Sequence, residues 1–111
     1  PDDKQARTLL GWALLGSGDY PQALKEFRIA GNDPQAVFGK GMCLMQLGES
    51  ENAIKAFRDV VQEQPNYWQA WGNLASLLDQ VNQPEQALEA WKQVLRLNPN
   101  DQMAKQRIQG N

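Results

Sequence analysis

Few residues of this sequence belong to the types that carry out catalysis, and their spacing does not bring them together. The 111 residues contain no histidine and one cysteine, Cys43. Histidine is the usual general base at neutral pH and the commonest metal ligand. A lone cysteine closes no internal disulfide and builds no thiol–metal cluster. We therefore expect no metal, no cofactor, and a buried structural thiol at Cys43.

The acidic residues do not supply a catalytic pair. The nearest candidates, Glu49 and Glu51, stand beside the start of a predicted helix, and we interpret them as solvated side chains at that helix start. The sequence also lacks a nucleophile–base pair and a glycine-rich phosphate loop. It therefore predicts a protein that is not an enzyme.

Charge and hydropathy exclude two further kinds of function. The 11 Lys and Arg residues are scattered among 13 Asp and Glu residues, with a net charge of −2, so we expect no nucleic-acid partner. The apolar runs are far shorter than the ~20 residues of a membrane-spanning helix. With 41% hydrophobic and 22% charged residues, the composition suits one globular or solenoid domain.

Apolar residues recur at helical spacing along the whole chain. The pattern predicts seven helices that begin near Lys4, Tyr20, Pro34, Ser50, Asn66, Pro84 and Asp101. Gly18, Gly48 and Asn82 follow three of these helices and suit the left-handed backbone that often ends a helix. The residues expected to cap the helix N-termini are Asp33, Ser50 and Asn66.

These helices form an internal repeat. Residues 34–67 and 68–101 align without gaps over 34 residues each, and residues 4–33 form a shorter copy of 30. Small and large residues recur at the same places in all three copies: Gly11, Gly41 and Ala75; Ala23, Ala53 and Ala87; Phe27, Phe57 and Trp91. We expect the small residues to let the two helices of a pair approach closely, and the large ones to fill the space between pairs.

This repeat resembles the tetratricopeptide repeat (TPR) family. In the third copy the family's characteristic places are held by Trp71, Leu74, Ala75, Leu78, Ala87, Trp91, Val94 and Pro99. The resemblance covers Lys4 to Asp101 and implies an all-α fold, a right-handed α-solenoid of three antiparallel helix pairs plus a C-terminal capping helix. We expect one domain over 1–111, with repeats 4–33, 34–67 and 68–101 and the capping helix at 102–109.

The copies differ in ways that predict local irregularity. Val37 stands where the third copy has Trp71, and Lys40 stands where it has Leu74. The first copy lacks four residues, about one helical turn, at the end of its second helix. We expect that helix to be one turn short, with a change of curvature or a gap on the convex side near Gly31–Asp33.

The two ends of the array look different. Pro1-Asp2-Asp3 resembles the triplets that end the later copies, and we interpret it as the end of an earlier copy in a longer array, an ordinary polar terminus being the alternative. The seventh helix has only Met103, Ala104 and Ile108 as apolar residues and is predicted to be a polar cap. The N-terminal end has no such cap, which leaves homodimerisation through it open.

The resemblance implies a concave groove lined by the first helix of each pair. In the third copy the groove places are polar, at Gln69, Gly72, Ser76, Asp79 and Gln80, whereas the earlier copies place large apolar side chains there. The core places of those earlier helices are already held by Leu10, Leu14, Val37, Gly41 and Leu44. A helix that is apolar on two faces needs two partners. The predicted partner-binding residues are Trp12, Leu15, Phe38, Met42, Met45, Gln46 and Asn73.

The second partner of these helices could be a ligand, an upstream repeat or another copy of the chain, and periodicity alone would assign the same residues to the core. Some TPR proteins grip a C-terminal carboxylate with Lys, Asn and Arg, but of the corresponding residues here only Asn73 fits that set. We expect an apolar or amphipathic peptide or helix as ligand.

The sequence thus predicts a non-enzymatic adaptor or scaffold in complex assembly; the alternative is self-association through the same apolar stripe or the N-terminal end. Nothing identifies a compartment, although the glutamine-rich, histidine-free composition favours a bacterial assembly or secretion factor of the cytoplasm or periplasm.

Overall fold

Helices make up most of the chain in the computed structural model, which describes residues 3–110. They are α1 (Lys4–Gly16), α2 (Tyr20–Ala30), α3 (Pro34–Gln46), α4 (Ser50–Glu63), α5 (Trp68–Gln80), α6 (Pro84–Leu97) and α7 (Gln102–Gln109). No strand occurs in the described range. The prediction made for Pro1-Asp2-Asp3 falls largely on residues outside that range.

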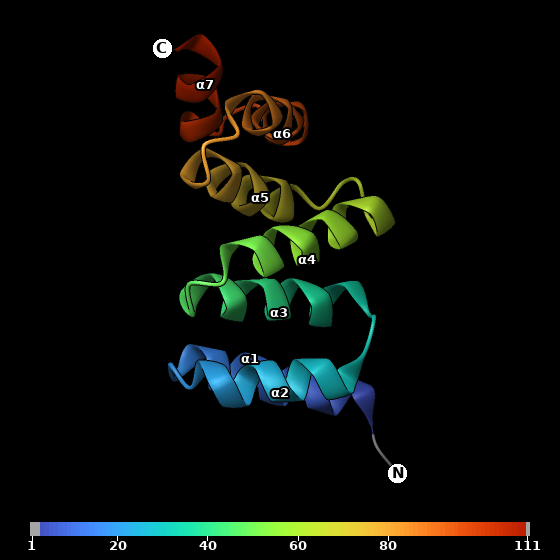
Figure 1. Cartoon of the computed structure of the whole chain (residues 1–111). Helices are drawn as coiled ribbons and strands as arrows, with labels where there is room; N and C mark the ends of the chain where they lie inside the picture. The colour runs from blue at the N-terminus through green and yellow to red at the C-terminus, as the bar shows by residue number, and fades with distance from the viewer. Residues whose placement is uncertain (1–2, 111) are drawn as a thin grey trace.

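The helices stack as antiparallel pairs in chain order, which confirms the predicted right-handed α-solenoid (Figure 1). The pairs are α1–α2, α3–α4 and α5–α6, and α7 packs against α6 at the C-terminal end. The stack extends 50 Å along its longest axis and 25 and 21 Å across it. Each helix therefore packs mainly against its neighbours in sequence.

The turns that join the two helices of each pair share one backbone conformation. Gly18, Gly48 and Asn82 have φ of 86°, 81° and 64°, so the predicted left-handed helix ends are confirmed. Asn82 is the one non-glycine residue with positive φ among residues 3–110. Asparagine tolerates this conformation better than other side chains, which explains its use where the earlier pairs have glycine.

Two of the predicted N-caps are wrong by one residue. Asp33 precedes α3 as expected, although its side chain makes no capping hydrogen bond. The N-cap residues of α4 and α5 are Glu49 and Tyr67, in place of Ser50 and Asn66, and neither side chain makes a capping hydrogen bond. Before α5 the chain forms a turn in which the N–H of Tyr67 donates to the carbonyl of Gln64 at 3.0 Å, and this delays the helix.

Glycines in the first helices allow close helix contact, as predicted from Gly41. A Cβ at Gly41 would lie 2.8 Å from the ring of Phe57, and one at Gly11 would lie 2.7 Å from the ring of Phe27. A third glycine, Gly39, would bring a Cβ within 2.3 Å of the same Phe27 ring. Phe27 therefore packs against its own pair through Gly11 and against the next pair through Gly39.

The prediction that Leu10 fills a core place is wrong. Leu10 is 46% exposed, whereas Leu74, at the same place in the third copy, is 3% exposed. Leu74 lies close to Val61 of α4, the second helix of the preceding pair. Among the described residues, no helix precedes α1 and covers its corresponding face. The burial of this place therefore depends on a preceding helix.

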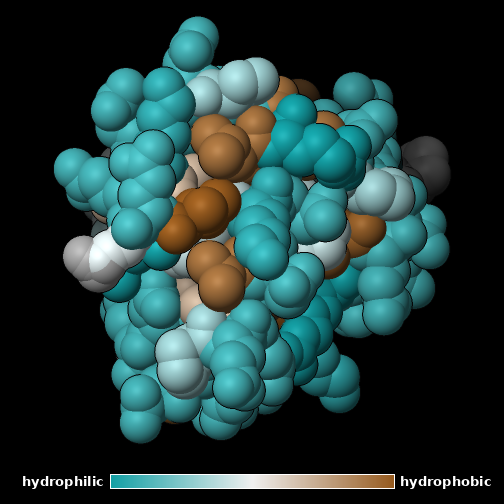
Figure 2. All heavy atoms as spheres, turned by 90° about the horizontal axis from the view of Figure 1, so that it is seen from above, coloured by the Kyte–Doolittle hydropathy of each residue, from teal (hydrophilic) through white to brown (hydrophobic). Residues whose placement is uncertain are grey.

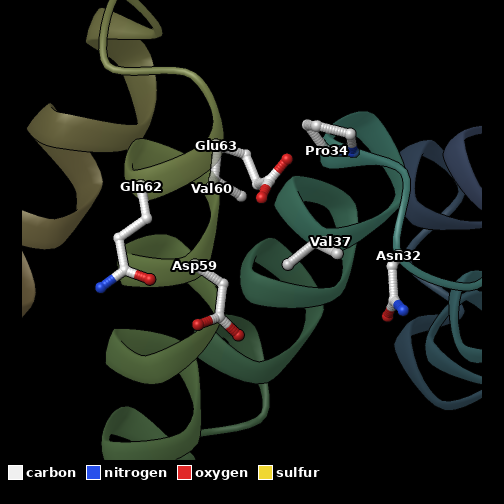
Figure 3. Close-up of a pocket in the computed structure, with 7 residues that line it drawn as sticks. All are labelled: Asn32, Pro34, Val37, Asp59, Val60, Gln62 and Glu63. Atoms are coloured by element: carbon white, nitrogen blue, oxygen red, sulfur yellow. The ribbon is translucent and has the colours of Figure 1, made fainter.

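The shortened first copy has the expected structural effect. Helix α2 has 11 residues, whereas α4 and α6 have 14 each, which confirms that it ends early. A cavity lies beside Asn32 and Pro34, where the missing turn would be (Figure 3). The sequence-based expectation of a gap at this point is therefore met.

The C-terminal end of the stack is capped as predicted. The carboxylate of Asp101 accepts a hydrogen bond from the N–H of Ala104 at 2.9 Å and so caps α7, and Ala104 is buried. Viewed from this end, the surface is mostly hydrophilic, with hydrophobic side chains gathered in small clusters (Figure 2). Helix α7 thus packs against α6 at the end of a mostly hydrophilic surface.

Cys43 is fully buried, as predicted for a structural thiol. Its burial raises the pKa of the thiol to about 11. Since the thiolate is the reactive form, this thiol is not set up to act as a nucleophile at neutral pH.

Candidate partner-binding groove

Trp12 on α1 begins a line of aromatic side chains that continues onto α3. Its ring meets Phe27 edge-on, with centroids 5.4 Å apart, and lies 6.0 Å from Phe38. Trp12 is half-buried, as is Leu15 three residues later on α1. Both side chains therefore pack on the core and keep part of their apolar surface exposed.

Phe38 is more deeply buried than a groove residue needs to be. It is 8% exposed, because Tyr67 stacks on it with ring centroids 4.8 Å apart and Phe57 meets it edge-on at 5.5 Å. Burial, together with the nearby Asp33 carboxylate, raises the pKa of the Tyr67 hydroxyl. Tyr67 thus presents the aromatic surface that the sequence assigned to Phe38.

Sequence reasoning missed Tyr67, although a signal for it exists. The same place is held by Asp33 at the end of the first copy and by Asp101 at the end of the third. This repeat position therefore carries an acid in the first and third copies and a large aromatic residue in the second.

Met42 and Asn73 connect the second and third pairs. The Nδ2 group of Asn73 donates to the sulfur of Met42 at 3.2 Å. Both residues are half-buried, as is Met45 on the next turn of α3, while Gln46 at the end of α3 is exposed. The structure therefore brings Met42 and Asn73 together, as it does Trp12 and Phe38.

A hollow of about 310 Å³ lies beside Asn73, between α5 and the start of α7. Of the predicted groove places in the third copy, Gln69, Gly72 and Ser76 line it. The remaining lining residues are Trp68, Asn73, Trp91, Asp101 and Met103. Sequence reasoning did not single out Trp68 or Met103 for this role, because the periodic pattern alone does not show which side chains of α5 and α7 face each other.

Asp79 does not present a free carboxylate, although its repeat position is one that points into the groove in the family. It accepts a hydrogen bond from the indole of Trp91 at 3.0 Å and lies 3.4 Å from the guanidinium of Arg107. Its charge is therefore used to join α5, α6 and α7.

The chemistry of these surfaces suits packing and hydrogen bonding. No cluster of three potential metal ligands occurs in the described part of the chain, and within the same range no helix has the length and hydropathy to cross a membrane. Every buried side-chain nitrogen and oxygen within residues 3–110 has a hydrogen-bond partner. What these surfaces offer a ligand is half-buried apolar side chains beside a hollow lined by both apolar and polar residues.

Comparison with known families identifies the repeat. Two family models, each described as tetratricopeptide repeat, match residues 8–67 and 44–108. Together they span all three helix pairs and most of α7.

The chain is similar to one protein whose name states a role in assembly. It is 26% identical over 110 residues to the photosystem I assembly protein Ycf3 of Synechococcus sp. (strain CC9605). The match covers 80% of this chain and 64% of that relative, so the chain spans less than two thirds of the relative's length.

Solved structures share the fold at low sequence identity. The first TPR of Spaghetti (RPAP3), bound to the HSP90 peptide SRMEEVD, has a TM-score of 0.89 and 16% identity, covering 96% of this chain and 87% of that one. MamA has a TM-score of 0.91 and 20% identity, covering 97% of this chain and 66% of that one. At such identities these likenesses concern the fold alone.

Proposed function

The chain belongs to the tetratricopeptide repeat family, and from this premise we propose that it is a non-enzymatic module for protein–protein interaction in the assembly of a larger complex. In this proposal an apolar or amphipathic segment of a partner protein binds along the first helices. The observation that carries it is the half-buried state of Trp12, Leu15, Met42 and Met45, which pack on the core and still expose apolar surface. The assembly role named for the relative supports it.

Apolar anchors would supply most of the affinity. Side chains of the partner that pack on Trp12, Met42 and Met45 would each contribute ~1.5–3 kcal/mol, less the cost of ordering the segment, which gives an affinity on the order of micromolar. Methionine suits such a surface because its flexible, polarizable side chain adapts to different partners.

Asn73 would add a polar contact. Its amide nitrogen is already bonded to Met42, and within residues 3–110 its amide oxygen has no hydrogen-bond partner. That oxygen is available to accept a backbone N–H from a bound strand or helix end.

The test begins with peptides selected from a random library on the immobilised protein. Their affinity is then measured by fluorescence anisotropy for the wild type, Met42→Glu and the matched control Ile29→Glu, which alters an exposed apolar residue of α2. A charge in the groove should weaken binding at least about tenfold, whereas the control should match the wild type. Unchanged binding to Met42→Glu would rule out the groove as the site.

A second candidate function is self-association through α1. Leu9 and Leu10 are 63% and 46% exposed on this helix, and among the described residues no other helix carries two exposed large hydrophobic side chains. Sedimentation velocity over a concentration series tests this. A concentration-dependent dimer that disappears in Leu9→Gln/Leu10→Lys would support it, and a monomer at all concentrations would exclude it.

A further inference from the structure

A cavity at the second pair results from two departures in the sequence. Its volume is about 330 Å³, at the small end of the ~300–1,000 Å³ range typical of ligand clefts. Val37 stands on its wall at the place where the third pair has Trp71, whose indole N–H donates to the carbonyl of Pro65 at 2.8 Å. The missing last turn of α2 leaves the same space uncovered on the side of Asn32. The cavity therefore lies where the second pair departs from the third.

The walls of the cavity combine an apolar floor with carboxylates. Pro34 and Val37 of α3 face Val60 of α4, and Asp59 and Glu63 extend from α4 on the same side (Figure 3). Asp59 and Glu63 are four residues apart, so they stand on one face of the helix, one turn from each other. In Figure 3 the Glu63 carboxylate reaches toward Pro34, whereas that of Asp59 points downward, away from Glu63.

The carboxylates beside the cavity have no ion-pair partner among the described residues. The last turns of α2, α6 and α7 contain Arg28, Arg96 and Arg107, whereas that of α4 contains no basic residue. The C-terminus of a helix carries a partial negative charge, which adds to that of the carboxylates. Neither Asp59 nor Glu63 forms an ion pair within residues 3–110.

We propose that this cavity is a second docking site, which receives an arginine side chain from a partner protein. The aliphatic part of the arginine would pack on Val37, Val60 and Pro34, since long basic side chains bury their stems on apolar surface. The planar guanidinium would then donate hydrogen bonds to the Glu63 carboxylate and, once the exposed Asp59 side chain rotates toward it, to that of Asp59. Charge complementarity thus selects arginine over an apolar anchor.

The site is separate from the groove of the proposed function. None of the residues that line it belongs to the predicted groove set, and Val37 and Phe38 project from different faces of α3. A partner could contact both sites, with an apolar segment in the groove and an arginine in the cavity. Loss of one site should therefore leave binding at the other intact, so that the two proposals fail independently.

The experiment uses a capped tripeptide, acetyl-Ala-Arg-Ala-amide, as the probe, and follows amide chemical shifts of the isotope-labelled protein at low salt. Citrulline in place of arginine gives a neutral probe of nearly the same shape. We expect shifts concentrated at Asn32, Val37 and Glu63 with the arginine peptide, and affinity at least about tenfold lower with the citrulline peptide, because the charge-assisted bonds are lost. Equal binding of the two peptides would overturn the proposal.

Two variants test the cavity itself. Asp59→Asn/Glu63→Gln removes the charge, and its matched control is Glu85→Gln/Glu89→Gln, two exposed acids with the same spacing on α6. Val37→Trp fills the space with the residue that the third pair uses. Asp59→Asn/Glu63→Gln and Val37→Trp should each abolish the chemical-shift changes, and the control Glu85→Gln/Glu89→Gln should keep them. Shifts that persist in Asp59→Asn/Glu63→Gln, or that disappear equally in the control, would refute the site even if Val37→Trp did not fold.

Discussion

The indole N–H of Trp91 on α6 donates a hydrogen bond to the carboxylate of Asp79 on α5, over 3.0 Å. Trp91 is 3% exposed, so removal of this acceptor would leave a largely buried N–H without its partner. We predict that Asp79→Ala lowers the free energy of unfolding by ~1–3 kcal/mol, the cost of leaving a buried donor unpaired. Urea unfolding followed by circular dichroism measures this.

Arg107 provides the comparison for that prediction. Its guanidinium lies 3.4 Å from the same carboxylate, but its side chain is largely exposed. An exposed ion pair is screened by water and salt, so Arg107→Gln should cost less than ~1 kcal/mol. Because Asp79→Ala removes both contacts, a loss from Arg107→Gln as large as that from Asp79→Ala would show that the ion pair, and not the indole hydrogen bond, accounts for the effect.

A second prediction concerns the glycines of the first helices. An alanine at Gly39 would bring its Cβ within 2.3 Å of the Phe27 ring, so that α3 or Phe27 must shift. We expect Gly39→Ala to destabilise the protein by ~1–3 kcal/mol, even though alanine favours helix formation. The shift of the urea midpoint gives the value.

The matched substitution is Gly72→Ala on α5. The nearest side-chain atom to its added Cβ would be in Val94, at an ordinary contact distance of 3.9 Å. Alanine should therefore stabilise the helix by up to ~1 kcal/mol. If both substitutions destabilised to the same degree, close packing on Phe27 would not be the reason for Gly39.

A third prediction separates two equivalent leucines. Leu10→Lys places on α1 the residue that the second copy carries as Lys40, and because Leu10 is exposed the change should alter stability by less than ~0.5 kcal/mol. Leu74→Lys, at the same place on α5, should cost at least ~2 kcal/mol, the lower end for loss of a buried leucine. If both variants lowered the free energy of unfolding equally, in thermal or urea unfolding, the difference in burial between Leu10 and Leu74 would be contradicted.

A fourth prediction follows from the raised pKa of Cys43, which is about 11 in the folded protein and 9.0 in an ordinary environment. Between these values the unfolded chain releases the thiol proton and the folded chain retains it. Stability should therefore fall as pH rises from about 9 to about 11, by at most ~1.4 kcal/mol per pH unit. Urea midpoints across this range should fall more steeply in the wild type than in Cys43→Ala.

The same burial predicts slow modification of the thiol. At neutral pH a thiol reagent should react with Cys43 only when the protein opens, because the side chain is fully buried and protonated. Rapid labelling of the native protein would contradict this.

The fold could be predicted because local and repeated patterns agree. The 34-residue spacing, Gly18, Gly48 and Asn82 after the helices, and Pro34 and Pro84 at helix starts all specify the same helix pairs. The shortened α2 could be foreseen as well, since four missing residues in a repeat remove one turn wherever they fall.

The site was less predictable because burial depends on neighbours that a single helix pattern does not reveal. Phe38 is covered by Tyr67, a residue from the turn before α5 that no helical period includes. Leu10 lacks the covering helix that its repeat position would have in the later pairs. The contact of Gly39 with Phe27 could not be predicted from the repeat, because the third copy has Asn73 at the same place and so shows no preference for a small residue there.

The contacts between successive helices also determine how the protein folds. Since each helix meets mainly the one before and the one after it, contacting residues are close in sequence, and chains of this kind fold rapidly. Local opening can begin at either end without disturbing the middle, as in a chain of coupled units. The centre of the array, where α3 and α4 have neighbours on both sides, is therefore where amide hydrogen exchange should be slowest, while α7, which packs mainly on α6, should exchange early.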